Sequence, residues 1–261
     1  MRILSSGDRI RPGVYAVRAR FARSVLLLGQ NDRALFVVDP SIGAGPLNLV
    51  VADPNAFVAG ETLAVARPEG PPFDSALPRA DLARLARVLE TALPRHAPPD
   101  SLVSLFFPAT KLPRFQRARD ALFQKAFAHF AAGRLAAGVR LIRGCGAGLT
   151  PAGDDFLCGW MLALRLRRRS ALAREILKHA QGKNPVSNAF LDLAAQGRVN
   201  DAVKKLLQAP SPARVRAVCA FGHSSGADLL CGVLWGLDGS RFAVHGGSAS
   251  SHPATAEPLN A

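Results

Sequence analysis

The chain has 261 residues, 49% of them hydrophobic, and a formal net charge of +14 at pH 7. This length and composition allow a conventional buried core, in one large domain or two modest ones. The apolar runs are all shorter than a membrane-spanning helix, which excludes a protein anchored by such helices. Residues 1–8 lack the apolar core of a secretory signal, so we expect a cytoplasmic protein with reduced cysteines.

The positive charge would attract anions in general, including nucleic acids, acidic proteins and small anionic metabolites. Nucleic acid is not the partner we expect, because no basic run is interleaved with aromatic residues as in RNA-binding motifs. The densest basic cluster, at residues 165–169, follows an apolar stretch, where arginines would stabilise the negative end of a helix dipole.

Residues 1–70 are predicted to form a β-rich domain. Short runs rich in Val and Leu alternate with turn-forming residues, a pattern typical of a small β-barrel or sandwich. A linker that contains Pro68, Gly70, Pro71 and Pro72 follows. The expected strands are 14–21, 24–28, 34–38, 47–51 and 62–65.

Residues 71–238 are predicted to form a mostly α-helical domain, so the expected fold class is α+β. An apolar stripe through Leu82 and Leu89 indicates one helix, and a second should run from about 114 to 131. The region 171–220 predicts three or four short helices, because glycines and prolines divide it. The Gly- and Ser-rich end, 239–261, is predicted to be a disordered tail.

Two segments of the helical region, 145–159 and 219–232, resemble each other. With one residue deleted, seven positions are identical and Thr150 faces Ser224, whereas average residue frequencies would give about one identity. Two such helix–loop units packed about a pseudo-dyad would bring the loops at 144–159 and 219–232 to one place. The identical pairs are Cys145 and Cys219, Gly148 and Gly222, Gly153 and Gly226, Asp155 and Asp228, Leu157 and Leu230, Cys158 and Cys231, and Gly159 and Gly232.

The first unit has the local chemistry of a helix start. Thr150 can cap the helix, Pro151 suits the first turn, and Asp154 and Asp155 fall near the positive end of the helix dipole. The glycines permit close approach of a ligand, and exposed amides at a helix start favour phosphate or carboxylate. The predicted anion-binding residues are Gly146, Gly148, Thr150, Gly153, Gly222, Ser224 and Ser225.

The aspartates repel an anion unless they bind a cation such as Mg²⁺, hydrogen-bond a substrate amide or accept a proton. Asp155 is favoured over Asp154, because its counterpart in the second unit is Asp228, whereas Ala227 stands opposite Asp154. His223 is a candidate general base or anion contact. The predicted catalytic residues are Asp155, Asp228, Asp154 and His223, and no metal ligands are assigned.

The same residues also allow a purely structural interpretation, as an alternative to catalysis and anion binding. In it the aspartates only cap backbone amides, the glycines only let helices pack closely, and His223 is a structural histidine. Glycine lowers helix stability, which argues that the loop as a whole has a further purpose. The four cysteines are too far apart in the sequence for a structural zinc site, and Cys158 and Cys231, each followed by glycine in an apolar stretch, are predicted to be small packing residues.

The segment 141–159, which contains Gly-Cys-Gly-Ala-Gly-Leu-Thr-Pro-Ala-Gly-Asp-Asp, resembles the signature of the AllH-type proteins. Residues 184–197 resemble the downstream Ser-x-x-x-Leu-x-x-Ala-x-x-Gly stretch of that family, and 43–46 agree with its β-rich start. The resemblance covers most of residues 14–237. Arg143 and Cys145 stand where the family pattern leads us to expect smaller or aliphatic residues.

The AllH-type family includes one subunit of bacterial oxamate carbamoyltransferase. The resemblance implies a part in purine and allantoin nitrogen catabolism, where this multisubunit enzyme interconverts oxalurate plus phosphate with oxamate plus carbamoyl phosphate. It therefore implies a subunit of a carbamoyl- or acyl-transferring complex, with other protein subunits and one of these small anions as partners. The alternative is a non-catalytic subunit that binds a metabolite or another protein.

Overall fold

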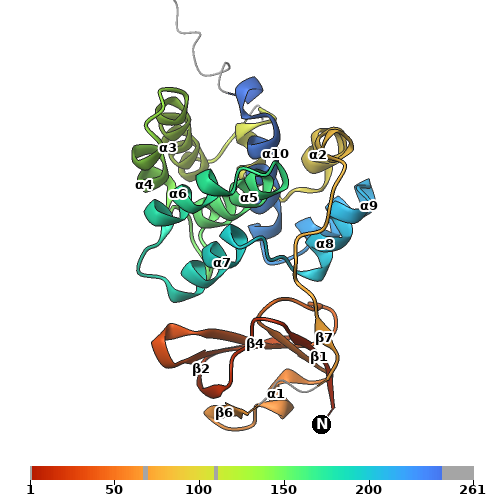
Figure 1. Cartoon of the computed structure of the whole chain (residues 1–261). Helices are drawn as coiled ribbons and strands as arrows, with labels where there is room; N and C mark the ends of the chain where they lie inside the picture. The colour runs from red at the N-terminus through yellow and green to blue at the C-terminus, as the bar shows by residue number, and fades with distance from the viewer. Residues whose placement is uncertain (1, 67–69, 109–110, 243–261) are drawn as a thin grey trace, which may run out of the picture.

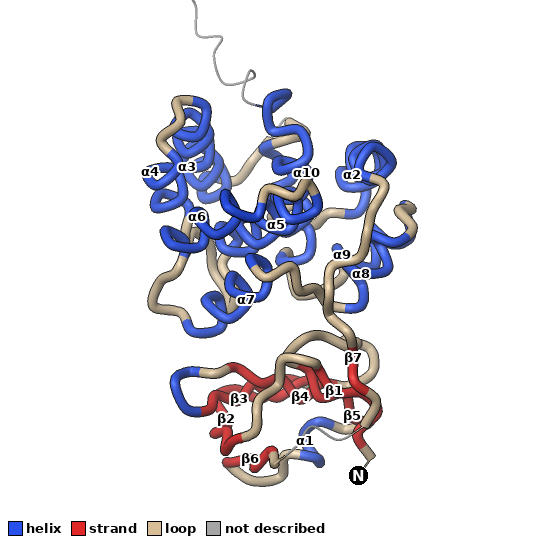
Figure 2. Tube along the Cα trace, in the orientation of Figure 1, coloured by secondary structure: helices blue, strands red, loops and turns tan. Residues whose placement is uncertain are grey.

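The computed structural model describes residues 2–66, 70–108 and 111–242. The strands form one layer, and the main helices lie on one side of it (Figures 1 and 2). This arrangement confirms the predicted α+β class. The strands are β1 (Ile3–Gly7), β2 (Gly13–Phe21), β3 (Ser24–Gly29), β4 (Ala34–Val38), β5 (Asn48–Val51), β6 (Thr62–Val65) and β7 (Pro72–Phe73).

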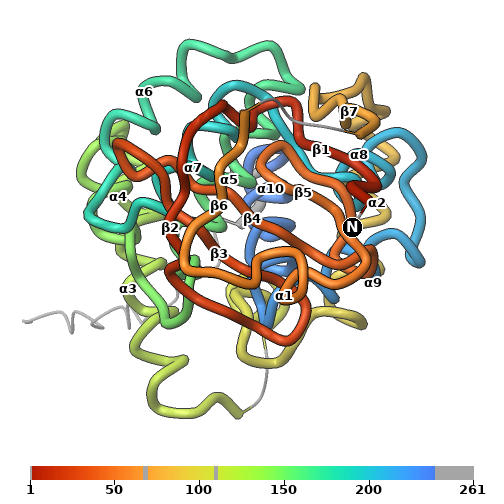
Figure 3. The backbone as a smooth tube through the Cα atoms, turned by 90° about the horizontal axis from the view of Figure 1, so that it is seen from below, coloured from red at the N-terminus to blue at the C-terminus, as the bar shows by residue number. Residues whose placement is uncertain are grey.

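The seven strands make a single curled sheet in the order β6-β2-β3-β4-β5-β1-β7. Neighbouring strands are antiparallel, except for the parallel pairs β4–β5 and β1–β7. Figure 3 shows the strands curving as they cross the base of the helical region. The predicted barrel or sandwich is therefore an open half-barrel, and Pro72, expected in a linker, begins β7 instead.

Both faces of the sheet are covered at its centre. Every residue of β4 is buried, as its unbroken apolar sequence requires. One face packs around Leu27, Leu35 and Val37, and the opposite face packs against the helix that follows Asn184. On that second face the rings of Phe36 and Phe190 stack with centroids 5.7 Å apart.

The helical region contains the two helices predicted from apolar periodicity and four short helices between 170 and 219. A 3-10 turn, η2, spans Leu102–Leu105, and another, η1, spans Gln30–Asp32 within the sheet region. The last helix continues beyond 238, so the predicted tail begins too early, and residues 243–261 lie outside the described part. The α-helices are α1 (Pro54–Phe57), α2 (Leu82–His96), α3 (Arg114–Ala131), α4 (Leu135–Ile142), α5 (Ala152–Leu166), α6 (Ser170–Ala180), α7 (Pro185–Ala195), α8 (Asp201–Gln208), α9 (Pro212–Cys219) and α10 (Ser225–Phe242).

Helices α5 and α10 lie at the centre of the helical region, with the other helices around them (Figure 1). All residues of α5 from Ala152 to Leu164 are buried, because this helix is apolar on nearly every side. The rings of Phe127 and Trp235 stack beside it with centroids 4.1 Å apart. Cys158, Cys219 and Cys231 are buried and Cys145 is half-buried, which confirms the packing role predicted for Cys158 and Cys231.

Polar contacts join the sheet to the helical region. Arg198, which follows α7, forms an ion pair with Asp8 after β1, with 3.0 Å between Nη1 and Oδ2. The Ser75 hydroxyl donates to the other oxygen of Asp8 at 2.6 Å. The backbone of Val199 donates to the Ser75 carbonyl at 2.9 Å, so the segment after β7 is anchored from both sides.

Candidate functional site

Helices α5 and α10 cross with their backbones in contact. A Cβ atom added to Gly159 would lie 1.9 Å from the carbonyl oxygen of Leu229, and one added to Gly232 would lie 2.0 Å from that of Phe156. Each distance is far below van der Waals contact, so only glycine fits at either position. These reciprocal contacts confirm the duplicated glycine-loop and helix unit, because each copy uses the same glycine against the other helix.

A second pair of glycines lies where each loop enters its helix. A Cβ atom on Gly153 would lie 1.7 Å from the carbonyl oxygen of Ile142, and one on Gly226 would lie 1.8 Å from that of Val218. Each helix therefore begins directly against the end of the helix that precedes its loop. Gly153, predicted to contact an anion, is buried under this carbonyl and faces no open space.

Hydrogen bonds show which loop residues are equivalent. Cys145 accepts from Gly153 N at 2.8 Å, and Phe221 accepts from Gly226 N at 3.1 Å. The second loop is therefore three residues shorter between these points, not one. The predicted pairs Cys145–Cys219 and Gly148–Gly222 are wrong, because matching identical residues puts the deletion too late in the alignment. The predicted pairs from Gly153 onward agree with the structure.

Thr150 and Asp155 connect the two loops. The Thr150 hydroxyl donates to Asp155 Oδ2 at 3.1 Å and lies 2.9 Å from the Ser225 hydroxyl of the second loop. The sequence predicts that Thr150 caps α5, but Pro151 is the N-cap and Thr150 binds a side chain instead. Burial raises the pKa of Asp155 well above its ordinary value, and the Ser225 and Thr150 hydrogen bonds oppose that rise only in part.

Asp228 is the equivalent carboxylate of the second unit. Its Oδ2 accepts from the Ser224 hydroxyl at 2.8 Å, as Asp155 accepts from Thr150, while its Oδ1 accepts from Leu102 N at 2.7 Å. The side chain is fully buried. Burial raises its pKa to about 6, against the lowering effect of the Leu102 and Ser224 hydrogen bonds.

Asp154 closes the first loop. Its Oδ1 accepts from Gly144 N at 2.7 Å, and burial raises the pKa of this carboxyl. Asp154 thus caps a backbone amide, as the structural interpretation proposed. All three carboxylates hold parts of the loops in place, and their catalytic roles stay a prediction.

The outer part of the first loop is open to solvent. Gly146, Ala147 and Gly148 are exposed, and their backbone N–H groups donate to no other residue in the described part of the chain. Gly146 and Gly148 have φ values of +124° and +101°, which side chains rarely adopt. These unpaired donors therefore lie in the loop where the sequence predicted an anion-binding site.

Three residues that sequence reasoning missed hold the loops. Asn184 Nδ2 donates to the Leu149 carbonyl at 2.9 Å, so α7 clamps the first loop. Leu102 N binds Asp228, and Asp100 Oδ2 lies 2.6 Å from His223 Nε2 in the second loop. No spacing signal could have found them, because they lie 35, 126 and 123 positions from their partners.

Residues 142–237 match the model of a family described as "Oxamate carbamoyltransferase subunit AllH". This part of the chain is similar to the AllH family, and the match covers less than half of the chain. The match begins at Ile142, whose carbonyl lies against Gly153, and includes both glycine loops and their helices. The description of that family names a subunit of an enzyme that contains other subunits. No curated protein and no solved structure matches the chain.

The AllH region brings most of the predicted residues to the two loops. Thr150 contacts both Asp155 and Ser225, and Ser224 donates to Asp228. Gly222 has a φ of +64°, in the turn that precedes His223. No helix among the described residues is long and apolar enough to cross a membrane.

Binding of a cation such as Mg²⁺ is one of the three alternatives that the sequence leaves open for the aspartates of these loops. Within residues 2–66, 70–108 and 111–242, no group of three or more His, Cys, Asp or Glu side chains is placed to hold a metal ion. The oxygens of Asp228 already accept hydrogen bonds from Leu102 and Ser224.

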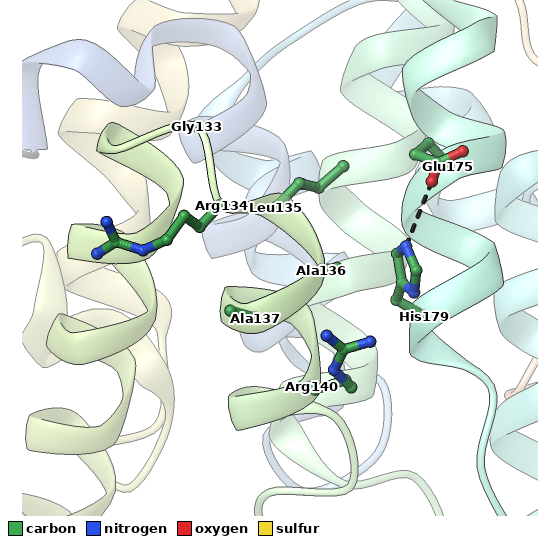
Figure 4. A pocket seen from close by; sticks show the side chains of 8 residues that line it. All are labelled: Gly133, Arg134, Leu135, Ala136, Ala137, Arg140, Glu175 and His179. Atoms are coloured by element: carbon green, nitrogen blue, oxygen red, sulfur yellow. Dashed lines mark hydrogen bonds and ion pairs between the residues drawn. The ribbon is translucent and has the colours of Figure 1, made fainter.

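An open pocket of about 460 Å³ lies away from the loops, between α4 and α6 (Figure 4). Arg140 and His179 face each other across it, and His179 pairs with Glu175 at 3.2 Å. The remaining lining is mostly the first turn of α4. None of the predicted site residues lines this pocket.

The Thr150 hydroxyl offers a first test of the connection between the loops. Replacement of Thr150 with valine should lower the free energy of unfolding by about 1 to 2 kcal/mol, because Asp155 and Ser225 lose a partner in a half-buried place. Urea denaturation measures this change. Thr150→Ser keeps the hydroxyl and should recover most of the loss, whereas equal losses in both variants would contradict the role of the hydroxyl.

Proposed function

We propose that this chain is the subunit of oxamate carbamoyltransferase that holds an anionic reactant at the two glycine loops. The observation that carries the proposal is the row of unpaired N–H groups at Gly146, Ala147 and Gly148. Such groups bind phosphate or carboxylate by direct hydrogen bonds. Carbamoyl phosphate, phosphate, oxamate and oxalurate each carry one of these anionic groups.

The reaction we propose joins oxamate to a carbamoyl group. The amide nitrogen of oxamate bonds to the carbamoyl carbon of carbamoyl phosphate, the bond from that carbon to the phosphate oxygen breaks, and phosphate leaves. The nitrogen loses one proton, which the departing phosphate finally carries. In the reverse direction phosphate cleaves oxalurate, which suits a role in purine and allantoin nitrogen catabolism in the cytoplasm.

The buried carboxylates would control the loop hydroxyls on the nitrogen side of this reaction. Burial raises the pKa of Asp155 and that of Asp228, so each can exchange a proton with its hydroxyl partner, Thr150 or Ser224, nearer to neutral pH than an ordinary aspartate. Thr150 and Ser225, which lie between the loops, would orient the substrate amide. Basic residues elsewhere on the chain favour the approach of an anion.

Another subunit would have to cover the loops for efficient transfer. Leu149 is 41% exposed, and the loop that carries it is open to solvent. Carbamoyl phosphate reacts with water, so a transferase has to exclude water from the reacting atoms. A partner surface that covers Leu149 would supply this enclosure, in keeping with a protein that works as one subunit of several.

Ligand binding can be tested on the purified chain through its melting temperature. Phosphate, carbamoyl phosphate, oxamate or oxalurate should raise it, because a ligand that binds only the folded chain stabilises it. Gly148→Ala should abolish the rise, since a side chain at φ +101° distorts the row of N–H donors.

Gly43→Ala is the matched control for Gly148→Ala. Gly43 also has a positive φ, +85°, and an added Cβ would likewise meet no neighbour within 4 Å. Both variants should therefore start with similar losses of stability, but only Gly43→Ala should keep the ligand-induced rise. No rise with any of the four anions in the unmodified chain would contradict the proposed site.

A second candidate function is a non-catalytic subunit that binds a metabolite or another protein. The observation that favours it is that Asp154 and Asp228 accept backbone hydrogen bonds as capping residues do. In that case the chemistry would belong to another polypeptide. Turnover of carbamoyl phosphate and oxamate by this chain without other subunits would eliminate this alternative.

A further inference from the structure

His223 in the second loop is paired with a residue far away in the sequence. Its Nε2 lies 2.6 Å from Asp100 Oδ2, and no other described residue forms a hydrogen bond with its side chain. The imidazole is 84% exposed, while the Asp100 side chain is 42% exposed. The pair therefore lies at the surface. His223 is two positions before Ser225, whose hydroxyl contacts that of Thr150.

Buried contacts fix the backbone that carries Asp100. The guanidinium of Arg119 donates to the carbonyl of Asp100, and its Nη2 donates to the carbonyl of Ser101 at 2.8 Å. Arg119 is itself buried and paired with Asp120 at 3.0 Å. Two residues further along the chain, Leu102 donates its N–H to Asp228. Asp100 is thus presented from a rigid support, unlike a typical surface carboxylate.

The pairing determines which nitrogen of His223 carries a proton. An ionised carboxylate can only accept hydrogen bonds, so Nε2 has to be the donor. Nδ1 is then the ring nitrogen that is free to accept a proton in the neutral imidazole. Fixing a histidine tautomer through a hydrogen bond from its other nitrogen is how proteins prepare this side chain for proton transfer.

We propose that Asp100 is a positioning residue for His223, and that His223 Nδ1 exchanges the proton of the reacting amide nitrogen. This inference rests on the proposed transferase function. In the forward direction the nitrogen–carbon bond forms, the carbon–oxygen bond to phosphate breaks, and Nδ1 takes the nitrogen's proton. The imidazolium then gives that proton to the released phosphate, which restores the neutral ring.

A purely structural ion pair predicts a different outcome. Exposed ion pairs contribute little to stability, so loss of the Asp100 carboxylate should leave the chain folded in either case. A structural role predicts no effect on turnover once the protein is folded. A positioning role predicts a change in the His223 tautomer and a lower kcat, with KM little changed.

The test is Asp100→Ala, which removes the acceptor of the Nε2 hydrogen bond, in the transferase assembled with its other subunits. We expect kcat to fall on the order of a hundredfold, the range that general acid–base catalysis supplies, with KM within about twofold. On the ¹⁵N-histidine-labelled chain, NMR should show a proton on Nε2 of His223 before the substitution and a mixture of tautomers after it. Unchanged kcat or an unchanged tautomer would overturn the proposal.

Glu175→Ala is the matched control, because Glu175 holds another histidine, His179, at 3.2 Å at the pocket between α4 and α6. It should leave kcat unchanged, and an equal fall in both variants would overturn a specific role for Asp100. If the unmodified complex transfers no carbamoyl group, the proposed function fails and the proton transfer with it. The NMR comparison would still decide whether Asp100 orients His223.

Discussion

Replacement of Gly159 with alanine is expected to lower the free energy of unfolding by about 3 kcal/mol, the upper part of the range for overpacked cores. The added methyl group would lie 1.9 Å from the carbonyl oxygen of Leu229, which is backbone and cannot rotate away. Helices α5 and α10 would have to separate along the centre of the core. For a chain of this size, that loss corresponds to roughly 6–12 °C in melting temperature.

Gly182→Ala is the control for this prediction, because an added Cβ there meets nothing within 4 Å and its φ is not positive. It should change stability by less than about 0.5 kcal/mol. Gly232→Ala should resemble Gly159→Ala, since its Cβ would lie 2.0 Å from the Phe156 carbonyl oxygen. The double variant should lose less than the sum, because the first substitution already separates the helices. A fully additive double variant would contradict the shared contact.

Asp228→Asn is expected to stabilise the chain at neutral pH and to abolish transferase activity. The pKa of Asp228 is raised from 3.8 to about 6, so folding disfavours the ionised carboxylate. The resulting loss of folding free energy is absent below about pH 4, grows as the pH rises towards 6 and is complete above pH 6. At 1.36 kcal/mol per pKa unit, it reaches ~3 kcal/mol for the ionised carboxylate. Asparagine never ionises, and its amide can still bind Leu102 N and the Ser224 hydroxyl.

Denaturation of both proteins at about pH 4 and pH 7 measures this effect. The asparagine variant should gain stability relative to the unmodified chain as the pH rises, while the two should be similar at the acidic end. Asp74→Asn should show the opposite sign and only below about pH 4, because hydrogen bonds from Ala76 and Lys204 lower the pKa of Asp74 from 3.8, so the unmodified chain loses that stabilisation as the pH falls below this value. Full transferase activity in the stabilised Asp228→Asn protein would contradict a catalytic role and favour capping alone.

The periodic elements are predictable from the chain itself. The helix predicted at 114–131 is α3, and the five expected strands correspond to β2 to β6. Each has an apolar pattern that matches its own period, so local burial determines its structure. The strands that sequence reasoning missed, β1 and β7, are short or contain Ser5 and Ser6. They form only because each finds a partner strand in the folded sheet: β1 pairs with β5, and β7 pairs with β1.

The candidate site likewise has a part that the sequence predicts and a part that only the structure reveals. Glycine spacing and capping chemistry are enough to indicate the paired loops, Thr150, Asp155 and Asp228. The alignment of the two loops cannot be read correctly from the residues alone, because equivalence depends on backbone hydrogen bonds such as that from Gly226 to Phe221. Asp100 has no motif around it and lies 123 residues from His223.

By itself, the sequence determined the α+β class, the duplicated unit, the resemblance to the AllH family and the residue types at the loops. These features depend on composition and on residues close together in the chain. Only the tertiary structure decided that Gly159 and Gly232 each meet the other helix's backbone, that Asn184 clamps the first loop, and that Asp100 contacts His223. Such contacts join distant segments, so they exist only when the packed core brings those segments together.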